Sequence, residues 1–191
     1  METTQTLSSS ISLGGGSSPQ WGEADFCAVF VEHYPRIVGI LVPLLGDRSR
    51  AEEVANDAFW RLYNRAGFKK DENVGGWLYR TATNLAIDAL RSAARRRQYE
   101  AAAGQPFGQG EAVGPLDRLL QEEKRRRIRV ALSAVRPAVA QLLILRTAGF
   151  SYKELAAALE VRTSGIGAML NRAEEEFRNR YLALFPDQEA L

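Results

Sequence analysis

The sequence predicts an all-α protein made of two small helical domains joined by a flexible linker. Apolar residues recur at helical spacing from Trp21 to about Gln98, and again from about Leu116 to Phe185. Between these blocks, the stretch from Ala101 to Pro115 combines Gly, Pro and Gln without periodicity, which is typical of a linker. Neither block shows strand alternation or an internal repeat. The predicted boundaries are a disordered tail at 1–20, domains at 21–98 and 117–185, a linker at 99–116 and a tail at 186–191.

The first predicted domain begins with two helical segments after the Ser- and Gly-rich tail. "DFCAVFVEHYPRIVGILVPLLG" is an apolar segment that Pro35 and Pro43 interrupt. "RAEEVANDAFWRLYNRA" is amphipathic and ends before Gly67. On this second segment we expect Val54, Phe59 and Leu62 to face the core.

The third helical segment, "WLYRTATNLAIDALRSAARRR", carries a polar stripe along one side. On a helical wheel the stripe contains Trp77, Arg80, Thr81, Asn84, Asp88, Arg91 and Arg95. A separate apolar arc contains Leu78, Ala82, Leu85 and Ala89. The stripe has the chemistry of a nucleic-acid surface, because arginine neutralises phosphate, asparagine bonds base edges and tryptophan stacks on bases. The alternative is an amphipathic helix with a solvated face, on which Asp88 and Arg91 form an ordinary ion pair.

The second block contains a helix-turn-helix pattern, "SYKELAAALEVRTSGIGAMLNRAEEEF". Ser151 and Glu154 have the spacing of a capping box, which predicts a first helix from Ser151 to Glu160. A turn through 161–164 and a longer helix to about Tyr181 follow. The expected core positions are Ala156, Leu159, Val161, Ile166 and Leu170. This unit favours DNA binding, although helical hairpins that only pack together are also common.

Composition limits the remaining possibilities. The chain has 191 residues, of which 46% are apolar, and we expect no segment that spans a bilayer. No secretory signal is visible, so we expect a cytoplasmic protein without a membrane partner. The single cysteine, Cys27, is expected to be a buried structural thiol, and the single histidine, His33, a surface or helix-packing residue. We expect no metal site, cofactor, small-molecule substrate or catalytic residue. The basic runs at 95–97 and 124–129 suit a polyanion or a solvated helix face equally.

The order of these motifs resembles the extracytoplasmic-function (ECF) group of bacterial RNA polymerase sigma factors, in the sigma-70 family. The resemblance lies in "AEEVANDAFWRLY", then "GGWLYRTATNLAIDALRSAARRR", then "YKELAAALEVRTSGIGAMLNRAEEEF", and it covers nearly all of residues 22–182. It implies a region-two domain and a region-four domain, neither of them an enzyme. The implied partners are core RNA polymerase, promoter DNA and an anti-sigma factor. The implied function is to direct promoter-specific transcription initiation.

The resemblance also assigns residues. Region two would hold the melted minus-ten element with Trp77, Arg80, Asn84, Arg91, Arg95, Arg96 and Arg97, and with Lys69, Lys70 and Asn73 of the preceding loop. We expect Asp88 to orient Arg91 or Asn84 rather than to touch DNA, since a carboxylate repels phosphate. Core polymerase would bind Glu53, Asn56, Asp57 and Arg61.

Region four departs from the family pattern. Gly167, Ala168 and Met169 stand where the family often has Lys, Ser and Arg. The residues left to contact the minus-thirty-five element are Arg162, Thr163, Ser164, Asn171 and Arg172. Such a surface could read thymine methyl groups, serve an atypical promoter or bind a protein. Two other functions therefore stay open: a helix-turn-helix regulator that does not recruit polymerase, and a sigma-like protein-interaction module. The acidic run at 174–176 is expected to be solvated.

Overall fold

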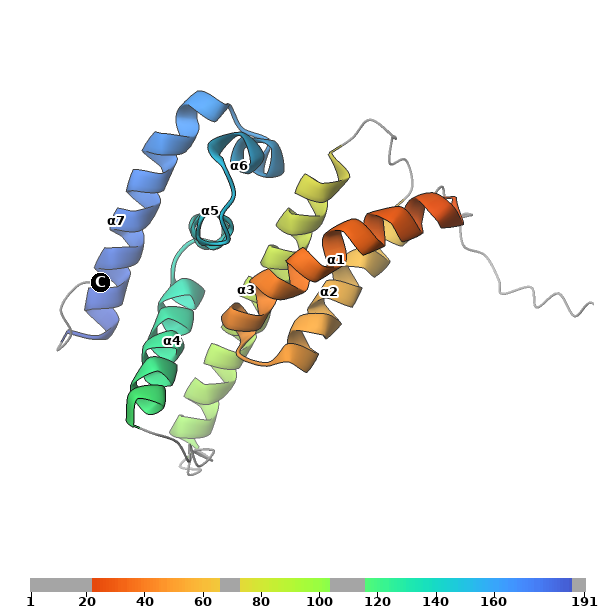
Figure 1. Cartoon of the computed structure of the whole chain (residues 1–191). Coiled ribbons are helices and arrows are strands. Elements are labelled where there is room, and N and C mark those ends of the chain that lie inside the picture. Colours follow the sequence, from red (N-terminus) through yellow and green to blue (C-terminus); the bar gives the residue numbers. More distant parts are fainter. Residues whose placement is uncertain (1–21, 66–72, 104–115, 187–191) are drawn as a thin grey trace, which may run out of the picture.

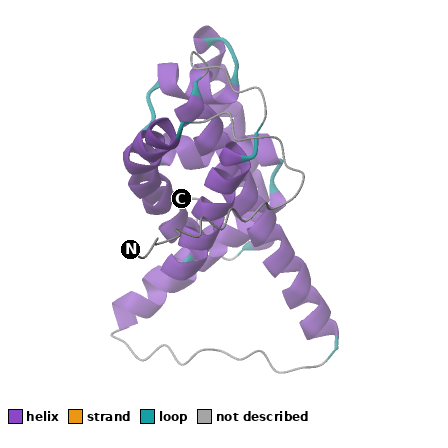
Figure 2. Ribbon diagram, turned by 90° about the vertical axis from the view of Figure 1, so that its right-hand side faces the viewer, coloured by secondary structure: helices purple, strands orange, loops and turns teal. Residues whose placement is uncertain are grey.

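The computed structural model describes residues 22–65, 73–103 and 116–186, in which helices are joined by short turns and no strand occurs (Figures 1 and 2). The first half (residues 22–103) contains α1 (Glu23–Leu45), α2 (Arg48–Tyr63) and α3 (Val74–Ala102). The second half (residues 116–186) contains α4 (Leu116–Ala134), α5 (Pro137–Thr147), α6 (Tyr152–Leu159), the 3-10 turn η1 (Thr163–Gly165) and α7 (Ile166–Leu184). The all-α class predicted from the sequence is confirmed.

Helix α1 is continuous, although the sequence predicted that Pro35 and Pro43 would interrupt it. A proline inside a helix costs about 3 kcal/mol or more because it removes a hydrogen bond and crowds the preceding turn. Burial of the opposite face offsets this cost, since Ile37 and Leu41 are fully buried. The helix ends at Gly46, whose φ of 76° lets its N–H bond the carbonyl of Val42.

Length and composition would allow α1 to cross a membrane, contrary to the expectation from the sequence. The segment Ala24–Leu45 has a mean hydropathy of 1.4. One face of its C-terminal part, including Ile37, Leu41 and Leu44, is nevertheless buried in the protein core. This helix therefore packs as a core helix of the first half.

Helix α2 starts and packs as its sequence predicts. The Asp47 carboxylate caps the helix by accepting from the backbone N–H of Ser49 at 2.8 Å. The buried face combines small alanines with two larger side chains: Ala51, Ala55, Ala58, Phe59 and Leu62. Phe59 and Leu62 are buried as expected, whereas Val54 is only partly buried.

Helix α3 is the longest helix of the described residues, and it continues to Ala102, past the boundary predicted at residue 98. Leu78 and Ala82 are buried, and Leu85 packs partly buried against the same core, as expected from the apolar arc. Tyr79, Thr83 and Ile87 are also buried, and they form a second buried face that the apolar arc did not predict.

The helix-turn-helix of the second half is present. Ser151 and Glu154 form the predicted capping box, and α6 ends at Glu160, which adopts a left-handed φ of 57°. Ala156, Ile166 and Leu170 are buried and Leu159 is partly buried, as predicted. Val161 was predicted to lie in the core but is 37% exposed, because it belongs to the turn after α6.

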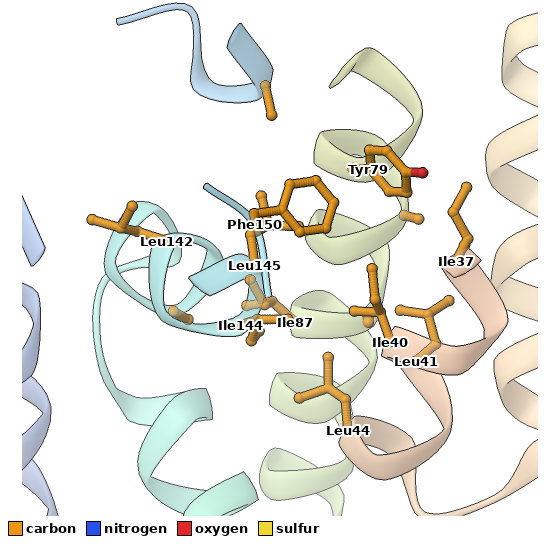
Figure 3. Packing of buried hydrophobic residues seen from close by; sticks show 14 of the residues in the cluster. Ile37, Ile40, Leu41, Leu44, Tyr79, Ile87, Leu142, Ile144, Leu145 and Phe150 are labelled. Atoms are coloured by element: carbon orange, nitrogen blue, oxygen red, sulfur yellow. The ribbon is translucent and has the colours of Figure 1, made fainter. Parts of the chain in front are cut away.

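The two halves share one hydrophobic core (Figure 3). Figure 3 shows Ile40 of α1 and Ile87 of α3 facing Ile144 of α5, with Phe150 directed toward Tyr79. Phe150 is 2% exposed, and its ring makes an edge-on contact with Tyr79 at a centroid distance of 4.8 Å. The second half therefore packs directly on α3.

Candidate nucleic-acid interface

The N-terminus of α3 is fixed by Asn73. Its side-chain oxygen accepts a hydrogen bond from the backbone N–H of Gly76 at 2.8 Å, which satisfies one of the free donors at the helix start. Asn73 was predicted to bind DNA, and the structure gives its side chain this capping contact. The two lysines predicted beside it, Lys69 and Lys70, lie outside the described residues.

The polar stripe of α3 is divided between solvent and the second half. Asn84, Asp88 and the arginines 95–97 are exposed, and Arg95 donates to the Ser92 hydroxyl at 3.2 Å. Arg80 and Arg91 are partly buried. Trp77 is also partly buried against the core, with the Arg65 guanidinium 5.1 Å from its ring centroid.

Arg80 contacts the second half through an ion pair and through its own backbone. Its guanidinium lies 2.8 Å from the carboxylate of Glu160, and this hydrogen bond is the main cause of a lowered pKa for Glu160. The side-chain amide of Gln141 donates to the Arg80 carbonyl and to the Thr83 hydroxyl, both at 2.9 Å. Thr83 is 1% exposed and Gln141 5%, so the hydrogen bond between these two side chains is buried.

Arg91 caps the end of α4. It donates from Nη2 to the carbonyl of Val135 at 2.8 Å and from Nε to the carbonyl of Ser133 at 3.2 Å. These carbonyls lie at the C-terminal end of the helix, where free acceptors and the helix dipole favour a cation. The predicted partnership of Asp88 with Arg91 is absent from the described part of the chain. Arg91 bonds the second half instead.

An aromatic and cationic cluster completes the contact between the halves. The Arg36 guanidinium lies 4.2 Å from the ring centroid of Phe150 and 3.6 Å from the carboxylate of Glu154. His33 Nδ1 and the Tyr79 hydroxyl oxygen are 3.2 Å apart. Burial lowers the pKa of His33 and raises the pKa of Tyr79. His33 is thus a helix-packing residue, as predicted.

The predicted polymerase-binding residues on α2, Glu53, Asn56, Asp57 and Arg61, are all exposed. Trp60 lies among them by helical spacing and is 65% exposed, with its ring stacked on Tyr63 at 6.0 Å. Trp60 was not among the residues predicted from the sequence. Its position four residues after Asn56 and seven after Glu53 was the available signal, since a tryptophan on a polar helix face has no core to fill.

The predicted DNA contacts of the helix-turn-helix lie at the start of α7 and in the turn before it. Arg162, Thr163, Ser164, Asn171 and Arg172 are all exposed. Arg172 donates to the carbonyl of Ala168 at 3.2 Å, one turn earlier in the helix. This surface thus presents two arginines and three neutral polar side chains.

One smaller expectation was wrong, and another holds only in part. Cys27 is exposed rather than buried, because it lies near the start of α1, before the part of the helix that enters the core. In the acidic run, Glu174 and Glu175 are exposed as expected, whereas Glu176 is partly buried and forms an ion pair with Arg136, with a hydrogen bond of 2.9 Å from Arg136 Nε. In the described ranges, no group of three or more His, Cys, Asp or Glu side chains could hold a metal ion.

Comparisons with known proteins identify the first half. Residues 29–96 match the family model for sigma-70 region 2, and this range contains the whole polar stripe of α3, from Trp77 to Arg95. The chain is 25% identical to the ECF RNA polymerase sigma factor SigE of Mycolicibacterium smegmatis over 168 residues, or 86% of this chain and 62% of that protein. The chain therefore spans less than two thirds of that relative.

Other proteins similar to this chain are also sigma factors. The ECF RNA polymerase sigma-E factor of Escherichia coli is 26% identical over 170 residues, covering 84% of this chain and 89% of that protein. SigW of Bacillus subtilis is 39% identical over 72 residues, 37% of this chain and 38% of that protein. Among solved structures, the sigma factor RpoE in complex with the anti-sigma factor NepR from Bartonella quintana aligns with 86% of this chain and 99% of that one, at 22% identity and a TM-score of 0.47. The first half thus matches the region-2 family model, and the sequence relatives of the chain are RNA polymerase sigma factors of the extracytoplasmic-function group.

Proposed function

We propose that this protein binds core RNA polymerase and directs transcription initiation from a limited set of promoters, without being an enzyme itself. The observation that carries the proposal is the region-two match at 29–96, which includes both the exposed α2 surface and the polar stripe of α3. We assign the domains as predicted, with region two at 21–98 and region four at 117–185. The cytoplasm is the expected location for this activity.

The α2 surface is proposed to bind core polymerase. Glu53 and Asp57 lie one turn apart and are exposed, and Trp60 adds an apolar side chain beside them. Acidic side chains around an exposed aromatic ring suit a basic partner surface, because charge guides the encounter and the ring supplies buried area. An anti-sigma factor is the other expected partner.

The α3 stripe is proposed to hold the melted minus-ten element. Asn84 can bond a displaced base, and the arginines 95–97 extend a positive surface along the same helix. Region four is proposed to contact the minus-thirty-five element through Arg162, Asn171 and their neighbours.

Binding to core polymerase tests the proposal. The exposed Cys27 allows a fluorescent label to be attached for anisotropy measurements with purified bacterial core polymerase. Asp57→Lys should weaken binding strongly, whereas Glu174→Lys, the same charge change on exposed α7, should not. Equal weakening by both variants, or no binding by the unchanged protein, would contradict the assignment.

A further inference from the structure

An apolar groove of about 720 Å³ lies between α1 and three helices of the second half. Ile40 and Leu44 of α1 form one wall, and Figure 3 shows both side chains directed toward the second half. The other walls come from α4, α5 and α7, with the apolar side chains Ile128, Leu132, Leu143 and Phe177. The volume falls within the range of about 300–1,000 Å³ that is typical of small-molecule sites.

The apolar lining of this groove is incompletely covered by the protein. Ile128, Leu143 and Phe177 are each partly exposed. Gly39, on the exposed side of α1, contributes no side chain, and a Cβ added there would have no other part of the protein within 4 Å. Because apolar surface gains free energy when it leaves water, an apolar occupant is favoured at this place.

The groove follows the axis of α1. Its lining on this helix extends from Arg36 to Leu44, a rise of roughly 12 Å at about 1.5 Å per residue. An extended carbon chain advances about 1.2 Å per bond, so roughly ten bonds span this length. The groove therefore has the length of one alkyl chain of medium size.

One cation stands at the groove without a partner. Arg129 of α4 lines the groove, and its Nη1 lies 3.2 Å from the position of a Cβ added at Gly46, at the end of α1. The dipole of α1 favours a positive charge at this end of the helix. Within the described ranges, Arg129 makes no hydrogen bond or ion pair. Burial is the main cause of a lowered pKa for Arg129, so an anion that reached this guanidinium would meet a partly desolvated charge.

The other charged groups at the groove determine which anion fits. Arg36 lies 3.6 Å from the carboxylate of Glu154, and Arg125 lies 2.7 Å from that of Glu122. These two arginines are therefore already paired, and Glu122 also attracts Arg129. A single unpaired cation suits a ligand with one negative charge, because a second charge would have no partner. A carboxylate meets this condition and can accept two parallel hydrogen bonds from one guanidinium.

We propose that this groove binds a single-chain fatty acid of medium length, with its carboxylate on Arg129 and its alkyl chain along Ile40 and Leu44. The described residues that line the groove come from α1 and the second half, and none belongs to α2 or α3. Occupancy of the site is thus independent of the proposed polymerase and DNA contacts. A bound fatty acid touches both halves and stabilises the folded chain by mass action.

Two pairs of variants test the two parts of the site. Arg129→Gln removes the cation and keeps a polar side chain, and its control is Arg118→Gln, the same change at an exposed position of α4. Gly39→Phe places a ring in the groove where an added side chain has space. Its control is Ala28→Phe, which adds the same ring at an exposed position of α1 outside the groove. Circular dichroism verifies that each variant keeps its helical content.

Binding is measured by isothermal titration calorimetry of the full chain with dodecanoate below its micelle concentration. Acetate supplies the carboxylate alone, and dodecyltrimethylammonium supplies the same chain with the opposite charge. We expect one dodecanoate per chain and no measurable binding of the other two compounds. Arg129→Gln should weaken dodecanoate binding about tenfold or more, as expected for a lost hydrogen bond to a charged group. Gly39→Phe should abolish it, and both control variants should bind as the unchanged protein does.

Three results would overturn the site. The first is a folded, unchanged protein that does not bind dodecanoate. The second is equal binding of dodecyltrimethylammonium or acetate, which would show that the charge or the chain is not recognised. The third is full binding by folded Gly39→Phe, which would place the fatty acid outside the groove. If Arg129→Gln loses helical content, the two comparison compounds and Gly39→Phe still decide between these outcomes.

Discussion

Arg91 of α3 donates to the carbonyl of Val135 at 2.8 Å, so a residue of the proposed DNA-binding stripe caps a helix of the other half of the molecule. The same guanidinium would bind the C-terminal end of α4 in one state and a DNA phosphate in another. Its substitution should therefore affect both the contact between the halves and the binding of DNA.

The first prediction concerns promoter opening. Arg91→Ala combined with Arg95→Ala should impair open-complex formation while core polymerase binding stays nearly unchanged, because neither residue lies on α2. The slope of log affinity against log salt should become shallower by about 0.7 for each phosphate of a single strand that the variant no longer neutralises. Permanganate reactivity of unpaired thymines measures the opening. Unchanged reactivity in the double variant would count against the DNA-binding role of the stripe.

The second prediction concerns Trp60. Trp60→Ala should weaken core polymerase binding by about 2 kcal/mol or more, as expected for an aromatic side chain at the centre of an interface. The protein's own stability should barely change, because the side chain is 65% exposed. Val31→Ala is the control, since Val31 is 73% exposed on α1 and lies outside the proposed polymerase surface. Equal binding by wild type and Trp60→Ala would remove Trp60 from that surface.

The third prediction concerns the glycines of the second half. Gly167→Ala should stabilise the protein by up to about 1 kcal/mol, because glycine is a poor helix former. An added Cβ at Gly167 would lie 3.8 Å from Tyr152, an ordinary contact. Gly149→Ala should instead destabilise, because the φ of Gly149 is +87°. Urea unfolding of the two variants measures both effects. Destabilisation by Gly167→Ala would contradict the prediction, because it would show that the start of α7 requires a glycine at this position.

The fourth prediction concerns acid stability. Hydrogen bonds from Arg126 and Arg127 lower the pKa of Glu123 in α4 from 4.5 to about 2. A lowered carboxyl pKa means that this contribution to stability is present above pH 4.5 and is lost as the pH falls toward 2. The stability difference between wild type and Glu123→Gln should therefore be largest near neutral pH and absent near pH 2.

The size of the Glu123 effect is expected to be small, because the side chain is 35% exposed and solvent screens the pairs. Thermal unfolding at several pH values between acid and neutral measures how this stability difference depends on pH, with Glu174→Gln as the control. A difference that does not depend on pH would contradict the ion-pair explanation.

The sequence predicted the local structure of this protein well. Ser151 and Glu154 fixed the start of α6, because a capping box depends only on residues three positions apart. The apolar spacing of Phe59 and Leu62 identified the buried face of α2, because helical periodicity also depends only on residues close in sequence. The exposed α2 residues were found from the resemblance to a family.

The parts that were missed depend on contacts between distant segments. Thr83 and Ile87 are buried because α5 and its neighbours pack on α3, and the periodicity of α3 alone does not reveal a second partner. Asp88 lies one turn from Arg91, yet Arg91 bonds carbonyls more than forty positions away. Pro35 and Pro43 predicted a break in the helix, and burial of the opposite face of α1 explains why the helix continues.

The central claim is that this protein directs initiation by core polymerase, and run-off transcription tests it most directly. Purified bacterial core polymerase is incubated with fragmented genomic DNA of the source organism, with the protein, without it, or with the Asn84→Ala, Arg91→Ala variant. The account predicts discrete start sites that require the protein and that weaken in the variant. Starts that are equally strong with the variant would contradict the role of α3, and the absence of any protein-dependent start would contradict the sigma-factor function itself.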